Sequence, residues 1–527
     1  MSDNGGVIHE PGELGPVPPR RRVWTLRALG LGAALLVYAL LGQAALSHDA
    51  RVVAAVATLM ALWWMTEALP LSVTSLLPII LFPLLTGRSV AQSTAPYANP
   101  IIFLFLGGFL IAIAMQKVGL HRRIALLTLR AVGTQPRRII LGMMISTAFL
   151  SMWVSNTATT LMMLPIALSV LTMVAENSGA AAVDLRAGLA SGRKLSELIH
   201  DKDVRTFGVG LVLAIAWSAS IGGLGTLLGS PPNAIVAGYI AEELGKQVGF
   251  AQWMMLGVPI VVCFIALAWL LITRVLFRFQ LDEVPGGRQL IEAQIAALGP
   301  MGRGEKSVRL VFVLAALCWI VPSLLSSVGG LGQALPWLRL FNDTVVALAA
   351  GLLLFMLPGP APGRAVLEWK DAERGLPWGV LLLFGAGLSL AAAVAGSGLD
   401  KWFGQQVIGL GALPIVALIA SVTLIVLFLT EITSNTATAA TFIPILGGVA
   451  LGIGIDPMVL LIPTALAATC AFMLPVGTPP NAIVFGTGVV SIAEMARGGL
   501  LLNLVGVVLI TVFTVLIGPW ALGMVMR

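Results

Sequence analysis

The chain has 527 residues, of which 58% are hydrophobic and only 10% are charged, and its formal net charge is +7. A soluble protein carries about 25% charged residues, so this composition excludes an aqueous globular fold and predicts an all-α polytopic membrane protein embedded in the lipid bilayer. The three cysteines are scattered through apolar segments and the four histidines lie outside them. A disulfide framework and a haem, copper or catalytic zinc site are therefore not expected.

The basic residues indicate membrane topology and give no sign of a nucleic-acid partner. When the N-terminus is placed in the cytoplasm and the spans alternate, most of the 31 Lys and Arg lie on the cytoplasmic side, as the positive-inside rule requires. Six lie on the outer side: Arg51, Arg88, Lys246, Arg339, Lys401 and Arg527. The expected location is a bacterial-type inner membrane, with a cytoplasmic N-terminus and a periplasmic C-terminus.

In chain order, the sequence begins with residues 1–24, a polar stretch rich in Gly and Pro that is expected to be disordered. A first transmembrane helix is expected within 25–50, with no signal-peptide cleavage site after it. The next unit, 51–278, holds further apolar spans and a basic amphipathic stretch at 118–134 that is typical of a helix on the inner surface. A hydrophilic insertion at 176–205 has no evident role.

A polar linker at 279–307, expected in the cytoplasm, separates this unit from a second one at 308–527. The two units carry the same motifs in the same order. The matched segments are Ser155–Thr159 with Ser434–Thr438, identical and 279 positions apart, and Gly229–Val236 with Gly477–Val484, alike at seven of eight positions. An odd number of expected crossings separates each matched pair, so the two units are predicted to be inverted repeats, a plan found in secondary transporters.

The Ser-Asn-Thr triplet of each pentapeptide lies midway along an apolar stretch that is too long for one crossing and too short for two. We therefore expect two re-entrant hairpins, at 136–176 and 412–451. Irregular backbone at membrane depth is tolerated only where it lines a cavity or is buried in protein. These triplets are therefore the predicted binding site for a solute and its coupling ions.

The matched segments Gly229–Val236 and Gly477–Val484 each contain two adjacent prolines followed by Asn, and these prolines predict an interruption of the helix. Two adjacent prolines remove two backbone donors, so the helices expected at 206–242 and 456–489 must each open at this point. The carbonyl groups freed there suit a sodium ion, and the helix that restarts after the break directs its positive end towards an anion. Two intramembrane carboxylates, Glu67 and Glu431, leave three roles open: a proton site, ion-site electrostatics, or structural capping and hydrogen bonding.

These motifs resemble those of the divalent anion/sodium symporter family. The resemblance covers residues 26–524 and rests on the paired triplets, the two Pro-Pro-Asn breaks, the Thr430-Glu431 pair that precedes the second triplet, and Trp63–Ala68, which is similar to that family's second helix. It implies a homodimer whose protomers have about eleven spans and two hairpins. It also implies a scaffold domain and a transport domain that moves past it in an elevator mechanism.

The resemblance also implies roles for individual residues. One sodium site would comprise Ser151, Ser155, Asn156 and Gly229, and the other Thr430, Thr433, Asn435 and Gly477. The substrate carboxylates would be held by, or lie beside, Asn156, Thr157, Ser230, Ser434, Asn435, Thr436, Thr478 and Pro479. Thr433 and Gly477 stand where the family pattern has Ala, but both would contribute only a backbone carbonyl.

The expected function is sodium-coupled import of a C4-dicarboxylate such as succinate, malate or fumarate, with Na+ supplying the positive charge that neutral donors lack. A sodium-independent dicarboxylate exchanger and a sulfate or citrate transporter on the same fold remain alternatives. A channel is not favoured by hairpins and broken helices. An enzyme is not expected, because the spans contain no nucleophile–base pair and no metal constellation.

Overall fold

The structure, a computed structural model, describes residues 20–44, 46–177, 188, 195–281, 287–327, 334–361, 363–406 and 413–526. These residues form helices and no β-strand. Ten of the helices among them are long and apolar enough to cross a membrane, and four shorter apolar segments accompany them. The prediction of an all-α polytopic membrane protein is thereby confirmed.

The N-terminal part comprises α1 (Arg20–Leu40), η1 (Leu41–Gln43), α2 (His48–Thr66), α3 (Leu71–Thr74) and α4 (Leu77–Leu85). Helix α1 begins at Arg20, so residues 20–24 are helical and the expectation that they are disordered is wrong; residues 1–19 lie outside the described part. The apolar segment Leu71–Leu85 is divided into α3 and α4, because Pro78 has no N–H with which to continue the helix. Glu67 ends α2 in a left-handed conformation, with φ of 49°.

The next elements are α5 (Val90–Thr94), η2 (Ala95–Ala98), α6 (Pro100–Lys117) and α7 (Leu120–Val132). Gly119, with φ of 75°, separates α6 from α7, because a left-handed residue ends a helix and glycine adopts that conformation at little cost. Helix α7 buries Leu126 and Leu129 and leaves Arg122 and Arg130 exposed, so it is amphipathic, as expected for a helix at a membrane surface.

Each Ser-Asn-Thr triplet lies at the junction of two helices. The first junction joins α8 (Pro136–Ser151) to α9 (Asn156–Asn177), and the second joins α22 (Ile415–Thr430) to α23 (Asn435–Gly452). In both cases the Asn is the first residue of the second helix. Ser, Asn and Thr prefer helix N-termini because their side chains bond to nearby backbone groups. This preference explains why the triplets start α9 and α23.

Each Pro-Pro-Asn segment begins a helix after a break. Helix α12 (Lys202–Gly222) is followed by α13 (Pro231–Leu244), and α24 (Met458–Thr469) by α25 (Pro479–Gly486). The prolines occupy the first two helical positions, where a missing N–H costs nothing. Of the hydrophilic insertion, 178–187 and 189–194 lie outside the described residues; its later part forms α11 (Leu195–Leu198) and the first turn of α12.

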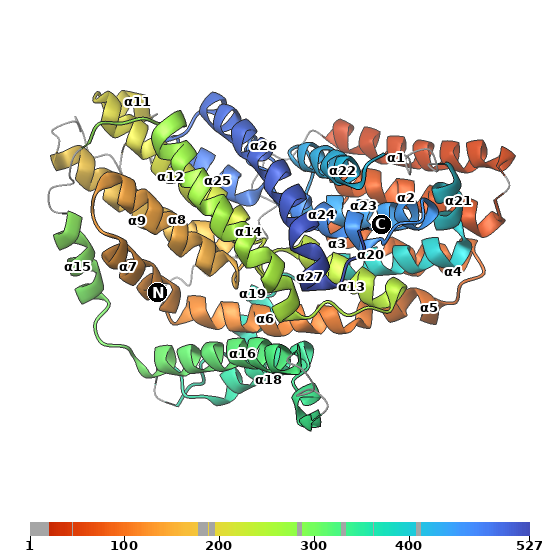
Figure 1. Cartoon of the computed structure of the whole chain (residues 1–527), viewed down its shortest axis with the longest axis horizontal. Coiled ribbons are helices and arrows are strands. Elements are labelled where there is room, and N and C mark those ends of the chain that lie inside the picture. The colour runs from red at the N-terminus through yellow and green to blue at the C-terminus, as the bar shows by residue number, and fades with distance from the viewer. Residues whose placement is uncertain are drawn as a thin grey trace.

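The remaining helices complete the two halves. They are α14 (Phe250–Leu270), which continues as a π-helical turn (Leu271–Leu276), α15 (Gly287–Ala297), α16 (Arg303–Ser327), η4 (Pro336–Leu340), α18 (Asp343–Met356), α19 (Trp369–Gly375), α20 (Trp378–Ser397), α21 (Leu399–Gln406), α26 (Ile492–Leu516) and α27 (Gly518–Leu522). Helix α16 packs on α18, which packs on α6, along one edge of the molecule (Figure 1).

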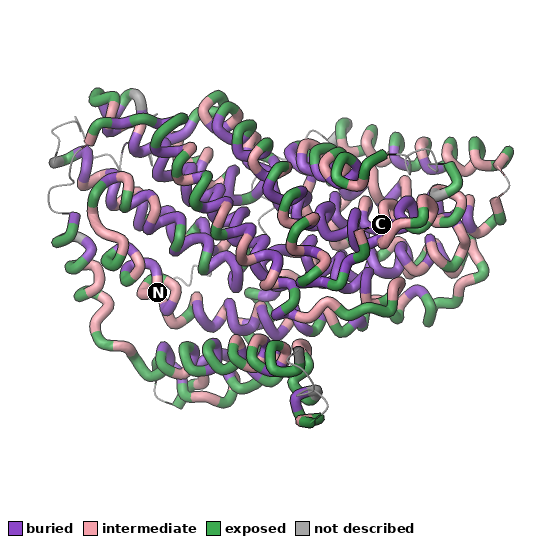
Figure 2. The backbone as a smooth tube through the Cα atoms, viewed as in Figure 1, coloured by how far each residue is buried: buried purple, intermediate pink, exposed green. Residues whose placement is uncertain are grey.

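Burial divides the helices into an inner and an outer set (Figure 2). In the most apolar stretch of α12, 89% of residues are buried within the protein, compared with 11% in α1. Helix α12 is therefore enclosed by other helices, whereas α1 presents leucines to lipid. The two junctions and the two breaks belong to the inner set, because α8, α9 and α25 pack on α12 while α22, α23 and α13 pack on α24.

Candidate functional site

The first junction brings a hydroxyl, an amide and two carbonyls together. Ser151 ends α8 and Asn156 starts α9, and the Ser151 Oγ lies 2.7 Å from the Ala219 carbonyl in α12. One amide atom of Asn156 lies 2.6 Å from the Ser151 Oγ, 3.1 Å from the Ala219 O and 3.2 Å from the Gly229 O. The junction and the α12–α13 break are therefore joined at one point.

The orientation of the Asn156 amide decides what this point can bind. With its nitrogen towards the three oxygens, Asn156 donates to all of them; with its oxygen towards them, four oxygens converge. In the second orientation the single Ser151 hydroxyl hydrogen cannot serve both the Asn156 oxygen and the Ala219 carbonyl. A cation would relieve this excess of oxygens, and hydroxyl, amide and carbonyl oxygens are ligands that sodium takes in unwound transporter helices.

The second junction has the same arrangement. Thr430 ends α22, and its Oγ1 lies 2.9 Å from the Oδ1 of Asn435 and 3.0 Å from the carbonyl of Ala468 in α24. Again one hydroxyl hydrogen faces two acceptors. Asn435 is the first residue of α23, as Asn156 is of α9. The two halves of the chain therefore build two oxygen-rich clusters, which we call the first and second oxygen clusters. Both contain a hydroxyl, an asparagine amide and an alanine carbonyl, and the first also contains the Gly229 carbonyl.

Gly223 and Gly229 allow the backbone of the α12–α13 break to approach the first oxygen cluster. A Cβ on Gly223 would lie 3.0 Å from the Asn156 Oδ1 and 3.1 Å from the Gly229 carbonyl. A Cβ on Gly229 would lie 2.6 Å from the Gly223 carbonyl, a distance that real Cβ atoms do not reach. Only glycine fits at position 229, and at position 223 a larger residue would have to displace the Asn156 amide or the Gly229 carbonyl by a few tenths of an ångström.

The asparagine of each Pro-Pro-Asn motif holds its own break together. The Asn233 Nδ2 donates to the carbonyls of Gly223 and Thr226, both at 2.8 Å. The Asn481 Nδ2 donates to the carbonyls of Ala471 at 3.1 Å and Leu474 at 3.0 Å. These freed carbonyls accept hydrogen bonds from side-chain amides. The carbonyls that face the oxygen clusters are instead those of Ala219, Gly229 and Ala468.

An indole group caps one further carbonyl in each break. The Trp253 Nε1 donates to the Leu224 carbonyl and the Trp217 Nε1 to the Phe472 carbonyl, both at 3.0 Å. Leu224 and Phe472 are 248 positions apart, the same spacing that relates the two Pro-Pro-Asn motifs. Both breaks are therefore fixed in equivalent places by donors from neighbouring helices.

Glu431 makes the second half different from the first. One carboxylate oxygen, Oε1, accepts from the backbone N–H of Phe472 at 2.8 Å and of Met473 at 3.0 Å, and from the Asn503 Nδ2 at 2.7 Å; the other, Oε2, accepts from Met473 and Leu474, both at 3.1 Å. All of these partners are donors, so the geometry favours an ionised carboxylate. Met152 occupies the equivalent position in the first half. Of the roles left open, the structure displays hydrogen bonding for Glu431.

The residues expected at the sodium sites do not all reach the oxygen clusters. Ser151, Asn156 and Gly229 come together in the first cluster, and Thr430 and Asn435 in the second. The Ser155 Oγ accepts from the Ala158 N–H at 3.3 Å, the Thr433 Oγ1 bonds to Thr438 at 2.7 Å, and Gly477 packs on Glu431. Among the contacts of the described residues, none joins these last three to a cluster.

The residues expected around the substrate line the same region. Asn156, Thr157, Ser434, Asn435 and Thr436 are half-buried, Ser230 and Thr478 are buried, and Pro479 is exposed. The Ser230 Oγ lies 2.9 Å from the Thr469 Oγ1, which links the break of the first half to the last residue before the break of the second. Helix α9 packs on α25, and α23 on α13. Each junction therefore borders the breaks of both halves.

Comparison with known proteins decides the family. The model of the sodium:sulfate symporter transmembrane region matches residues 21–525. The chain belongs to this family. The resemblance to divalent anion/sodium symporters is thereby confirmed, and this member of the family is a membrane transporter and not an enzyme.

Two relatives are similar over most of the chain. The sodium-dependent dicarboxylate transporter SdcS of Staphylococcus saprophyticus is 41% identical over 484 residues, which cover 91% of this family member and 88% of the relative. The protein of the same name from Staphylococcus aureus strain MRSA252 is 41% identical over 474 residues, covering 89% and 86%. Both relatives share nearly the full length of this symporter-family chain.

Two solved structures share the fold at low sequence identity. The YdaH transporter of Alcanivorax borkumensis superposes with a TM-score of 0.57 at 14% identity, over 90% of this chain and 99% of its own. MtrF of Neisseria gonorrhoeae, described as one of a class of antimetabolite efflux pumps, superposes with a TM-score of 0.52 at 11% identity, over 94% and 98%. At these identities the similarity extends to the fold alone.

Proposed function

We propose that this symporter-family protein imports a C4-dicarboxylate, such as succinate, malate or fumarate, by coupling its uptake to sodium. The observation that carries the proposal is the pair of oxygen clusters, in which Ser151 with Asn156 and Thr430 with Asn435 present equivalent sets of neutral oxygens. The names of the two staphylococcal relatives, sodium-dependent dicarboxylate transporters at 41% identity, support the choice of ion and substrate class.

Electrostatics supports the coupling. A dicarboxylate carries two negative charges, whereas the groups expected to hold it, such as Thr157 and Thr436, are neutral hydroxyls and amides. One sodium ion at each oxygen cluster would supply the missing positive charge beside the substrate. The N-termini of α9 and α23 add the positive ends of two helix dipoles. Sodium and dianion would thus stabilise each other, which is the thermodynamic basis of coupling.

The sodium ions would also tie the site together. Asn156 would turn its amide oxygen towards the ion, so the ion would bridge the α8–α9 junction to the end of α12 and to Gly229. A matching bridge through Thr430 and Asn435 would join the second junction to α24. Both junctions would then move with the breaks as one transport domain, past a scaffold in a homodimer. The inverted repeats and the cytoplasmic N-terminus belong to the same proposal.

Uptake of labelled succinate into liposomes tests the proposal. Purified protein should accumulate succinate when sodium is placed outside, and should not do so when choline replaces it. Preloading the liposomes with unlabelled succinate separates import from exchange, because only an exchanger depends on an internal substrate. Equal uptake in choline, or uptake seen only after preloading, would contradict the proposal.

Sulfate is the second candidate substrate, because the family model that matches the chain describes sodium:sulfate symporters. Sulfate is also a dianion, so it suits the same pair of sodium ions. Competition by unlabelled sulfate or citrate against labelled succinate distinguishes the candidates. Strong competition by sulfate, with little by malate or fumarate, would move the assignment from dicarboxylate to sulfate.

A further inference from the structure

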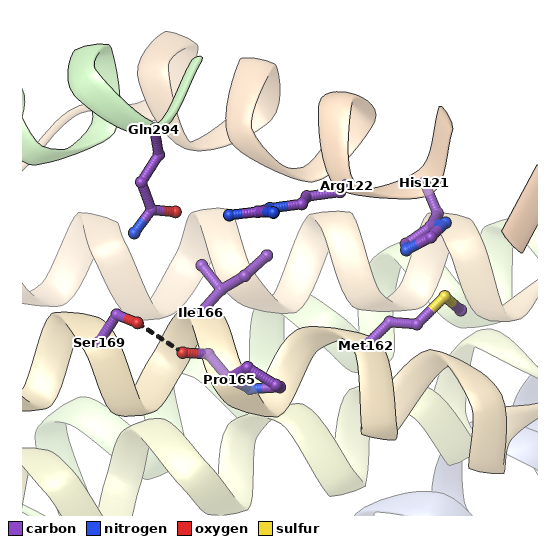
Figure 3. Close-up of a pocket in the computed structure, with 7 residues that line it drawn as sticks. All are labelled: His121, Arg122, Met162, Pro165, Ile166, Ser169 and Gln294. Carbon is purple, nitrogen blue, oxygen red and sulfur yellow. Dashed lines mark hydrogen bonds between the residues drawn. The ribbon is translucent and has the colours of Figure 1, made fainter. Parts of the chain in front are cut away.

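A cavity away from the oxygen clusters lies between α7, α9 and α15. Its volume is about 280 Å3, just below the usual range for small-molecule sites. The lining residues are His121, Arg122, Met162, Pro165, Ile166, Ser169 and Gln294. Figure 3 shows Arg122 lying lengthwise above Ile166, with the Gln294 amide on one side and the His121 ring on the other. One side of the cavity is therefore apolar and comes from α9, and we call it the floor; the opposite side is polar and comes from α7 and α15.

Two adjacent arginines on α7 have different partners. Arg123 bonds through its guanidinium to the Glu305 carboxylate and, at 3.1 Å, to the Gly299 carbonyl, which anchors α7 to the start of α16. Arg122 points into the cavity and, among the described residues, has no hydrogen-bond or ion-pair partner. A guanidinium with five free donors is a ready site for a phosphate.

The groups on either side of Arg122 suit hydroxyl groups. The His121 Nδ1 lies 3.1 Å from the Met115 carbonyl, so Nδ1 carries the hydrogen. Burial lowers the pKa of His121; the hydrogen bond to Met115 opposes this and the charge of Arg122 adds to it, and the pKa is lowered on balance, so the ring is neutral and its Nε2 is an acceptor. The Gln294 amide offers both a donor and an acceptor and has no described partner.

The floor suits a hydrocarbon chain. Met162 and Ile166 lie one turn apart on α9, and the neighbouring Leu161 is 54% exposed. In the proposed topology, α7 and α15 lie at the cytoplasmic membrane surface, where lipid headgroups and acyl chains meet. The cavity thus places a cation and hydroxyl partners above an apolar surface, which matches the order of groups in a phospholipid.

We infer that this cavity binds an anionic phospholipid with a hydroxylated headgroup, of the phosphatidylglycerol type. Arg122 holds the phosphate, His121 and Gln294 hold the headgroup hydroxyls, and an acyl chain lies along Met162 and Pro165. The lipid joins α7, which Arg123 anchors to α16, with α9, which carries Asn156. An effect of this lipid on transport rests on the proposed function; its binding does not.

The test measures the unfolding temperature of the delipidated full-length protein in detergent. The probes are dioctanoyl phosphatidylglycerol, dioctanoyl phosphatidylcholine and inorganic phosphate. Phosphatidylglycerol should raise the unfolding temperature and the other two should not. Arg122→Gln should raise the half-saturating concentration of phosphatidylglycerol about tenfold, as expected for a lost charged hydrogen bond. Arg130→Gln, an exposed arginine on the same helix, should leave it unchanged.

Three results would overturn the inference. These are equal stabilisation by phosphatidylcholine, an equal effect of inorganic phosphate, which would indicate a soluble anion, and an unchanged response in Arg122→Gln. If Arg122→Gln does not fold, Gln294→Leu serves instead, and must weaken phosphatidylglycerol binding severalfold. Because the readout is binding without transport, failure here leaves the proposal of sodium-coupled uptake standing, and failure of uptake leaves this inference standing.

Discussion

Ser151 and Thr430, 279 positions apart, make the same two contacts. Each is the last residue of a helix, each hydroxyl lies within 2.9 Å of the asparagine that starts the next helix, and each lies within 3.0 Å of an alanine carbonyl near the end of a broken helix. A serine hydroxyl in the first half and a threonine hydroxyl in the second thus occupy equivalent positions between an asparagine amide and a backbone carbonyl. We propose that each places an oxygen on a sodium ion.

The first prediction concerns these hydroxyls. Ser151→Ala and Thr430→Val each remove one oxygen from a cluster, so each should weaken sodium binding about tenfold. Sodium that binds only the folded protein raises the unfolding temperature, and the sodium concentration needed for half of that rise measures affinity. Ser146→Ala and Thr423→Val are the controls, because these buried hydroxyls bond only to helix carbonyls among the described residues. Equal sodium responses in all four variants would contradict the prediction.

A second prediction concerns Gly223. Alanine there would place a Cβ 3.0 Å from the Asn156 Oδ1 and 3.1 Å from the Gly229 carbonyl, so these two oxygens must shift by a few tenths of an ångström and the geometry of the first oxygen cluster must change. Gly223→Ala should therefore abolish sodium-dependent succinate uptake while the protein still folds and purifies. Gly486→Ala is the matched control, because nothing lies within 4 Å of a Cβ at that position. Uptake at the wild-type level in Gly223→Ala would show that this close approach is dispensable.

The Glu431 carboxylate provides the third prediction. It accepts hydrogen bonds from three consecutive backbone N–H groups and from Asn503. In Glu431→Gln, one amide nitrogen would face donors, so the α24–α25 break should loosen, at a cost of about 3 kcal/mol in the free energy of unfolding. Thermal unfolding of Glu431→Gln beside Glu373→Gln, an exposed glutamate, measures the difference. An unchanged unfolding temperature would mean that these bonds do not stabilise the break.

The fourth prediction is a pH dependence at Asp371, in the loop helix α19. Burial raises the pKa of this carboxyl, but hydrogen bonds from the Lys117 ammonium, at 2.6 Å, and from the Glu368 backbone N–H, at 2.7 Å, outweigh it. Together with the charges of Lys117 and Arg364, they lower the pKa below its usual value. A lowered pKa in the folded state stabilises the protein above the unfolded-state pKa, and this contribution is lost as pH falls through the folded-state pKa.

Asp371→Asn should accordingly lower the unfolding temperature slightly at pH 7. The loss in the free energy of unfolding should be no more than about 1 kcal/mol, because the side chains of Asp371 and Lys117 are both partly exposed. The difference from wild type should shrink as the pH falls below the ordinary value for aspartate. Thermal unfolding of both proteins across this pH range measures it. A difference that grows towards acid pH would contradict the assignment.

Much of the helical framework could be predicted from the sequence. Asn156 and Asn435 start helices because short polar side chains favour that position, and the paired prolines start α13 and α25 because their missing N–H groups cost nothing there. The repeated motifs also bring Ser151 to Asn156 and Thr430 to Asn435. The helix boundaries were harder to predict, because α1 begins at Arg20, inside the stretch expected to be disordered.

The site was only partly predictable, because several of its groups are backbone atoms. Ala219 and Ala468 each contribute a carbonyl, which any residue could supply, so their side chains carry no signal. Only their positions could have indicated a role: Ala219 and Ala468 each lie near the end of a helix that must open before a Pro-Pro-Asn segment. Gly223 could have been suspected from the Gly-rich break that contains it. The partners of Glu431 depend on α26, far away in sequence, and no local pattern indicates them.

The initial rate of labelled succinate uptake, measured as external sodium replaces choline at constant ionic strength, tests the central claim most directly. With one sodium ion at each oxygen cluster, the rate should be near zero without sodium and rise more steeply than in proportion to its concentration. A rate that does not depend on sodium, or one that follows a single-ion hyperbola, would contradict the account of two coupled sodium sites.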